Sequence, residues 1–179
     1  MTLEKLKYPI GQSNIPEIIT NEHIKNWIEI IDKHPDQLIE LVSNLTDEQL
    51  DKPYRPDGWT SRQVVHHLGD SHTNSYIRFK WTLTETSPII KAYDEVKWAE
   101  LPDTKHAPIA HSLTYLKSLH QKWVYLLKTL TSSDLKKYFI HPATGNKVTL
   151  EKNIGIYAWH CQHHFEHINQ LLIREGWKQ

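Results

Sequence analysis

The chain contains little cysteine, little glycine and no surplus of charge of either sign. One cysteine, Cys161, among 179 residues excludes an internal disulfide, which fits a protein of a reducing compartment. Six glycines are few for a loop-rich β fold and favour long helices. Lysine plus arginine and aspartate plus glutamate are equal at 21 each, so no basic excess is available to hold a nucleic-acid backbone.

The sequence also lacks long hydrophobic runs. No apolar stretch approaches the length that spans a bilayer, and residues 1–11 lack the apolar core of a signal peptide. With 39% hydrophobic and 23% charged residues, the composition is typical of a globular chain. We therefore expect a cytoplasmic protein with no nucleic-acid or membrane partner, folded as one domain over residues 1–179.

Histidine, by contrast, is concentrated in one segment near the C-terminus. Four of the 13 histidines fall within eight consecutive positions and form two pairs, His160/His164 and His163/His167. Each pair has the i, i+4 spacing that places two side chains on one face of a helix, with Cβ atoms roughly 5–6 Å apart. Two imidazoles in this arrangement can reach one metal ion at the usual Zn–N distance of about 2.0–2.1 Å.

The residues around these histidines predict a helix. Thr149 is a suitable N-cap, and no proline occurs between Leu150 and Arg174. Gly176 can supply the left-handed residue that follows a helix. The histidine pairs are therefore expected on the last helix of the chain.

A helical wheel separates the two pairs. His164 and His160 lie about 60° and 100° from the centre of the apolar stripe, whereas His163 and His167 lie about 160° and 120° from it. We therefore expect His160/His164 to border the core and His163/His167 to face solvent or a partner. His163, Glu166 and His167 also match H-x-x-E-H, a zinc-protease pattern, but a chance match in a histidine-rich helix is the simpler interpretation.

Turn and capping residues predict the other elements. Thr60 and Gln63 form a capping box at the start of a long helix, and Pro108 fits the first turn of another. We expect helical segments over residues 21–33, 35–45, 60–84, 108–130 and 150–174. We expect an extended arm over residues 1–19, a loop over 51–58, an irregular crossover over 87–103 with one helical turn near Trp98, and a hairpin or irregular loop over 138–150. Four long helices with long connections indicate a four-helix bundle.

His67, on the helix that follows the capping box, is the natural third ligand for a metal held by His160 and His164. It shares its side of that helix with Ser71, Asn74 and Arg78, which would leave a polar pocket beneath a neighbouring helix. Three neutral imidazoles leave the ion its full charge and an open coordination position, as in catalytic zinc sites. The alternative is that these are ordinary polar histidines bonded to their neighbours.

Other side chains near the proposed site allow two interpretations each. Cys161 can be a nucleophile, but its place in the apolar stripe is more typical of a small buried hydrophobe. Asn153 and Tyr157 can bond a substrate or fill ordinary buried polar roles, and Asp70 can orient a ligand or be a surface carboxylate. Five tryptophans are expected in the core or at an interface, with an aromatic pocket wall as the alternative: Trp59, Trp81, Trp98, Trp123 and Trp159.

Longer sequence blocks resemble a known family. They are Tyr8 to Gly11, Tyr54 to Thr60, Arg62 to Leu68, Asp70 to His72, Tyr76 to Lys80, Leu83 to Glu85, Trp98 to Asp103, His141 with Pro142, and Tyr157 to His160. On these blocks the chain resembles the YfiT branch of the DinB-like superfamily, which includes the bacillithiol S-transferases. The resemblance covers nearly the whole chain.

The resemblance implies an up-down-down-up four-helix bundle, a homodimer and one divalent ion per chain, zinc first and nickel second. The family's ligand motifs land on His67, His160 and His164, in agreement with the helical wheels; its catalytic residues beyond the ligands are not identified. The implied activity is that of a metal-dependent hydrolase or thiol S-transferase, in which the ion activates water or a low-molecular-weight thiol such as bacillithiol against a small electrophile. The alternative is a non-catalytic, metal-binding dimeric protein.

Overall fold

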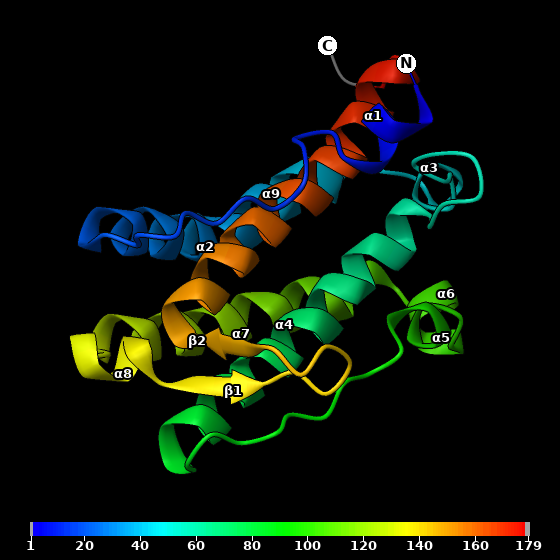
Figure 1. Cartoon of the computed structure of the whole chain (residues 1–179). Coiled ribbons are helices and arrows are strands. Elements are labelled where there is room, and N and C mark those ends of the chain that lie inside the picture. Colours follow the sequence, from blue (N-terminus) through cyan, green and yellow to red (C-terminus); the bar gives the residue numbers. More distant parts are fainter. Residues whose placement is uncertain (1, 178–179) are drawn as a thin grey trace.

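Four long helices form the body of the molecule (Figure 1). A computed structural model describes residues 2–177. The long helices are α2 (Asn21–Val42), α4 (Ser61–Thr84), α7 (Ile109–Thr129) and α9 (Leu150–Arg174). The short elements are α1 (Leu3–Lys7), α3 (Asp47–Leu50), α5 (Glu95–Ala99), α6 (Pro102–His106), α8 (Ser132–Lys136), β1 (Tyr138–Ile140) and β2 (Lys147–Thr149).

The helix ends follow the capping chemistry of the sequence. Thr60 and Gln63 exchange hydrogen bonds of 3.0 and 3.1 Å at the start of α4, so the expected capping box is confirmed. Thr149 accepts a bond from the backbone N–H of Lys152 at the start of α9, and Gly176 has φ +71° just past its end. These contacts satisfy backbone groups that helix ends otherwise leave unpaired.

The bundle has the expected up-down-down-up topology. Each long helix packs against two others, in the ring order α2, α7, α4, α9. Helix α7 runs antiparallel to α2, because Lys117 pairs with Asp36 whereas Lys128 pairs with Asp32. Helix α4 runs parallel to α7 and antiparallel to α9, as the contacts of successive residues show. The four-helix bundle class is thereby confirmed.

Three local expectations change. Residues 21–42 form one continuous helix with Pro35 inside it, where we expected a break. Tertiary packing keeps the helix intact: Pro35 cannot donate to the Ile31 carbonyl, and His120 of α7 donates to that carbonyl instead, at 2.6 Å. The N-terminal arm contains a short helix, α1, and the crossover contains α6 in addition to the expected turn near Trp98.

The core is divided by a layer of imidazoles. One apolar cluster surrounds Phe79, Trp123 and Ile154, and the other surrounds Leu68 and Leu116. Five histidines occupy the levels between these clusters on the four long helices: His34, His72, His120, His160 and His164. The hairpin of β1 and β2 pairs antiparallel, with Phe139 opposite Val148, and lies against α9. None of the helices among residues 2–177 combines the length and apolar character needed to cross a membrane.

Candidate metal centre

Two antiparallel helices bring together the three histidines proposed from the sequence. His160 and His164 are one turn apart on α9, and His67 faces them from α4. One ring nitrogen from each lies within 4.8 Å of the others, and among residues 2–177 this is the one group of three or more histidine, cysteine or acidic side chains close enough to share an ion. His67 and His160 are 93 residues apart in the sequence, and the packing of α4 against α9 brings their side chains together.

The spacing fits a tetrahedral ion. The Nε2 atoms of His67 and His160 are 3.3 Å apart. Two nitrogens bound to one tetrahedral ion at 2.0–2.1 Å lie about 3.3–3.4 Å apart, so this separation suits two ligands as well as it suits a hydrogen bond. Three imidazoles are also a donor set that zinc and nickel accept.

Neighbouring imidazoles hold His160 in the tautomer that a metal needs. His160 Nδ1 is 3.0 Å from His72 Nε2, His72 Nδ1 is 2.6 Å from His120 Nε2, and His120 Nδ1 is 2.6 Å from the Ile31 carbonyl. That carbonyl can only accept, so His120 donates to it, His72 donates to His120, and His160 donates to His72. Each ring stays neutral, and Nε2 of His160 keeps a free lone pair toward His67.

Pro35, inside α2, contributes to this line of hydrogen bonds from His160 through His72 and His120 to the Ile31 carbonyl. In an uninterrupted helix the carbonyl of residue 31 would accept from the N–H of residue 35, and proline has none. The line His160–His72–His120 therefore ends on an acceptor that the α2 backbone does not use. The sequence did not indicate that His72 and His120 support the site, or that Pro35 does more than start a helix, because these three residues lie on three different helices.

His164 is oriented in a similar way by His167. The Nε2 of His167 is 2.9 Å from the Lys7 carbonyl and donates to it, which leaves Nδ1 as an acceptor facing His164 Nδ1 at 3.4 Å. In that arrangement Nε2 of His164 is the free nitrogen. His163 and His167 were expected to face solvent or a partner, and the solvent alternative was wrong: both are buried, because the N-terminal arm, with Tyr8 6.0 Å from the His163 ring, covers that side of α9.

Burial keeps the three histidines neutral. Desolvation lowers the pKa of His67 to about 4 and holds the pKa values of His160 and His164 well below the usual value. The nearby imidazoles add to the effect, since a second positive charge in the cluster would be repelled. Neutral rings with available lone pairs are the form in which histidine binds a metal.

The histidines open onto a cavity of about 570 Å³ between α4, α9, the crossover and the hairpin. Trp59 lies on one side, with its ring 4.7 Å from that of His67, and Trp159 on another. For these two tryptophans the pocket-wall interpretation is correct. Tyr157 also lines the cavity, and its hydroxyl donates to the Ser71 carbonyl at 3.1 Å.

Other candidates lie elsewhere. Asn153 donates to Ser75 in the core, and His66 contacts Ser112 and the Ala107 carbonyl, away from the cluster. The half-buried Asp70 makes no side-chain hydrogen bond to the three histidines. The H-x-x-E-H residues do not assemble, since Glu166 bonds Asn169 and Gln170 instead.

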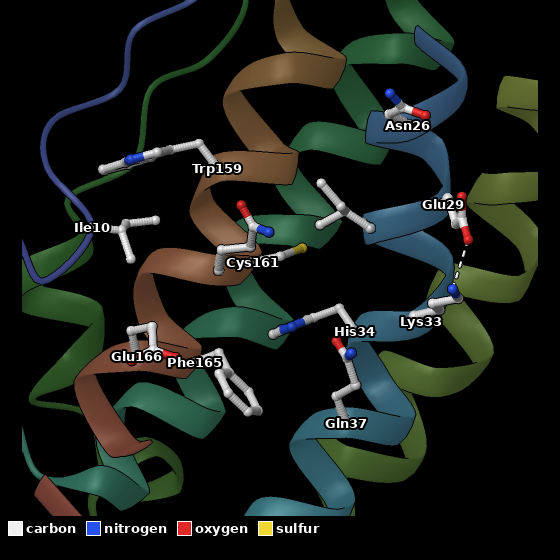
Figure 2. Close-up of a pocket in the computed structure, with 12 residues that line it drawn as sticks. Ile10, Asn26, Glu29, Lys33, His34, Gln37, Trp159, Cys161, Phe165 and Glu166 are labelled. Carbon is white, nitrogen blue, oxygen red and sulfur yellow. Dashed lines mark hydrogen bonds and ion pairs between the residues drawn. The ribbon is translucent and has the colours of Figure 1, made fainter. Parts of the chain in front are cut away.

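A second, larger cavity of about 680 Å³ lies between α2 and α9 (Figure 2). Cys161 and His34 lie in its wall, and the ion pair between Lys33 and Glu29 lies at its edge. Cys161 is fully buried, and burial raises its thiol pKa well above the usual value, so the thiolate is disfavoured. The interpretation of Cys161 as a small buried hydrophobe fits this position.

Comparison with known proteins agrees with this geometry. The sequence model of the DinB superfamily matches residues 30–168. "Putative metal-dependent hydrolase YfiT" of Bacillus subtilis (strain 168) is 50% identical over 177 residues, covering 99% of each chain. A relative in Bacillus cereus (strain 03BB102), named "Putative metal-dependent hydrolase", is 52% identical over 175 residues, covering 98% of this chain and all of that protein.

A solved structure has the same architecture. The YfiT structure from Bacillus subtilis is described as a probable metal-dependent hydrolase with an unusual four-helix bundle topology. It superposes with a TM-score of 0.95 at 49% identity, covering 97% of this chain and 99% of that one. The sequence blocks, the bundle topology and these matches agree, and the chain belongs to the DinB superfamily.

Proposed function

We propose that His67, His160 and His164 hold one divalent ion, zinc before nickel, and that the chain uses it to activate water or a low-molecular-weight thiol against a small electrophilic substrate. One observation carries the proposal: three neutral imidazoles from two helices converge on one point that opens to a cavity. The names of the relatives support the metal dependence and the hydrolase class. Transfer to a thiol such as bacillithiol is the finer alternative within the same chemistry.

When bound on three neutral ligands, such an ion supplies Lewis acidity and lowers the pKa of a coordinated water or thiol toward neutrality. The chain's own groups supply the rest. His72 and His167 orient the ligands, and Trp59 and Trp159 add aromatic surface to the cavity wall. Tyr93 also lines the cavity, and because burial raises its pKa, its hydroxyl stays protonated as a donor at neutral pH.

The first test is metal content. The alanine variants of His67, His160 and His164 are each expected to lose most of the ion measured by elemental analysis of the purified protein. His66→Ala and His163→Ala are the controls, and they should retain it. Full retention in His164→Ala would refute the ligand set.

The second test is turnover. Metal-loaded protein is offered ester and amide substrates, and separately a panel of thiols with electrophiles. The proposal expects turnover that a chelator abolishes and Zn²⁺ or Ni²⁺ restores. A non-catalytic metal-binding dimer would bind the ion and turn over nothing. The homodimer stays a prediction from the resemblance, and the cytoplasmic location stays a prediction from the composition.

A further inference from the structure

Arg78 of α4 is a buried cation without a partner. It is 9% exposed, its Nε is buried without a hydrogen-bond partner, and no ion pair joins it to an acidic side chain of residues 2–177. The other deeply buried arginine, Arg62, is 5% exposed and binds Asp51 at 2.7 Å and Asp47 at 2.6 Å. Burying a charge is costly unless it is paired, and arginine stays protonated in proteins. The environment of Arg78 therefore lacks a negative group that Arg62 has.

The unpaired guanidinium belongs to the same cavity as the three histidines. Two further lining residues, His141 and His163, have a buried Nδ1 without a hydrogen-bond partner. Of the six buried, unpartnered side-chain polar atoms among the described residues, three therefore belong to residues that line this one cavity. Buried polar groups are normally satisfied, so such a concentration indicates a place where a polar ligand binds.

The local charges favour an anion over a neutral ligand. Desolvation, with a contribution from the charge of Arg78, lowers the pKa of His141, so this ring stays neutral beside the guanidinium. The one carboxylate among the lining residues, Glu95, is exposed to solvent. Hydrogen bonds between a guanidinium and a carboxylate or phosphate are short, often bidentate and about twice as strong as neutral ones.

Arg78 and His67 also lie on one face of α4. Eleven residues separate them, which at 100° per residue is about 20° of rotation after three turns, and about 16 Å along the axis. Arginine on a helix leans toward the N-terminus, in this case toward His67. A ligand that reaches both ends of the cavity therefore needs a span on the order of 10 Å. Ser71 and Tyr157 line the stretch between them.

We propose that Arg78 binds the anionic end, carboxylate or phosphate, of an elongated substrate whose reacting atom lies at His67, His160 and His164. This inference rests on the proposed function, because it places the reacting end at those histidines. It adds a substrate class: small electrophiles or thiols that carry a negative group at a distance from the reacting atom.

Binding of mercaptoalkanoic acids to the cobalt-loaded protein tests the inference. The thiolate-to-cobalt charge-transfer band reports the dissociation constant without any turnover. Acids of increasing length, namely 3-mercaptopropionate, 6-mercaptohexanoate and 8-mercaptooctanoate, are compared with their methyl esters. We expect the acid to bind at least ten-fold more tightly than its ester for the two longer chains, and about equally for the shortest.

Variants assign the preference to Arg78. Arg78→Met should bind acid and ester alike, with the affinity for the ester unchanged. Glu95→Gln, which removes the rim charge, is the matched control and should keep the preference. If Arg78→Met does not accumulate as folded, cobalt-binding protein, Arg78→Lys carries the test, and a several-fold smaller preference is expected because lysine cannot form a bidentate pair.

The outcomes separate the two proposals. A band with equal affinities for acid and ester, or a preference that is independent of chain length, overturns the role of Arg78 while the metal-held nucleophile stands. The role of Arg78 is also overturned if Arg78→Met still prefers the acid over the ester, or if Arg78→Lys shows the same preference as the unchanged protein. Absence of the band with every thiol overturns this inference and the thiol form of the proposed function, while activation of water at the three histidines stands.

Discussion

The ring of His160 is positioned by residues of other helices. Its Nδ1 contacts His72, which contacts His120, which donates to the carbonyl of Ile31. Partners of this kind fix the tautomer of a metal-binding histidine and typically change metal affinity 10–100-fold when removed. The line has one consistent direction of donation, because its last acceptor is a carbonyl.

His72→Phe should therefore weaken metal binding while leaving the three proposed ligands in place. Phenylalanine keeps an aromatic ring of similar size but cannot accept from His160 Nδ1, so we expect the metal dissociation constant to rise about 10–100-fold. Competition with a chromophoric chelator measures it. His34→Phe is the control: the His34 ring lies 6.0 Å from that of His72 but takes no part in the line. Equal effects of the two changes would mean that His72 only fills space.

Cys161 gives the opposite expectation. It is 0% exposed, and it lines the α2–α9 cavity rather than the cavity of the histidines. Cys161→Ser should keep the bound metal and most turnover, while the buried hydroxyl lowers the free energy of unfolding by about 1–3 kcal/mol. Urea denaturation and elemental analysis check the two parts. A large loss of turnover in folded, metal-loaded Cys161→Ser would mean that the thiol takes part in the reaction.

At the scale of elements, the start of α4 connects stability to the site. Thr60 and Gln63 form the capping box, and Gln63 also donates to the Ala99 carbonyl of α5 at 2.8 Å. His67 follows one turn after Gln63. Fraying of the first turn would therefore disturb both the crossover and the proposed ligand on α4.

Thr60→Ala should lower the free energy of unfolding by about 1 kcal/mol, the usual cost of losing an N-cap. Thr20→Ala is a matched control, because Thr20 caps α2 with the same pair of bonds, far along the chain from any proposed ligand. We expect similar losses of stability in urea, and a several-fold weaker metal affinity in Thr60→Ala alone. Unchanged metal affinity in both Thr60→Ala and Thr20→Ala would show that metal binding does not depend on the N-cap of α4.

The N-terminal arm is a second element that acts on α9. Its Lys7 carbonyl accepts from His167, and Tyr8 lies beside His163. The arm converts a helix face that the wheel assigns to solvent into a buried one. His167 is therefore a buried residue whose ring is held by the Lys7 carbonyl and faces His164.

At the scale of the whole molecule, buried neutral histidines make stability depend on pH. Burial lowers the pKa of His34 to about 3 and those of His67 and His120 to about 4. Between these values and the unfolded value of about 6.5, the unfolded chain binds more protons than the folded one. Stability is therefore greatest above the unfolded value and is lost as the pH falls toward 4.

The free energy of unfolding of the metal-free protein should be nearly constant above about pH 7.5 and fall between about pH 6.5 and 4, by up to about 1.4 kcal/mol per pH unit for each such histidine. Asp70, whose pKa is raised to about 6 by burial, acts in the opposite direction. It is one group against several, so the histidines should dominate. Urea midpoints across this range measure the slope, and His34→Phe should reduce it. A flat profile from pH 8 to 5 would contradict the neutral histidine layer.

The sequence by itself determined the long helices, their caps, the bundle class and the three histidines proposed as ligands. These follow from local chemistry: Thr60 and Gln63 cap each other within one turn, and i, i+4 spacing places His160 beside His164 on any helix. His67 followed from its polar neighbours on the helix after the capping box, and the family resemblance implied the same ligand. The resemblance also supplied the up-down-down-up topology of the bundle, which the structure confirms.

Only the tertiary structure decided what covers and orients those residues. The burial of His163 and His167 depends on an arm more than 150 residues away, and the hydrogen bonds from His160 to Ile31 join all four long helices. Pro35 lies inside α2 because a histidine of α7 uses the carbonyl that it leaves free. Helical periodicity describes one helix at a time, whereas these contacts are set by how separate helices pack, which no local pattern encodes.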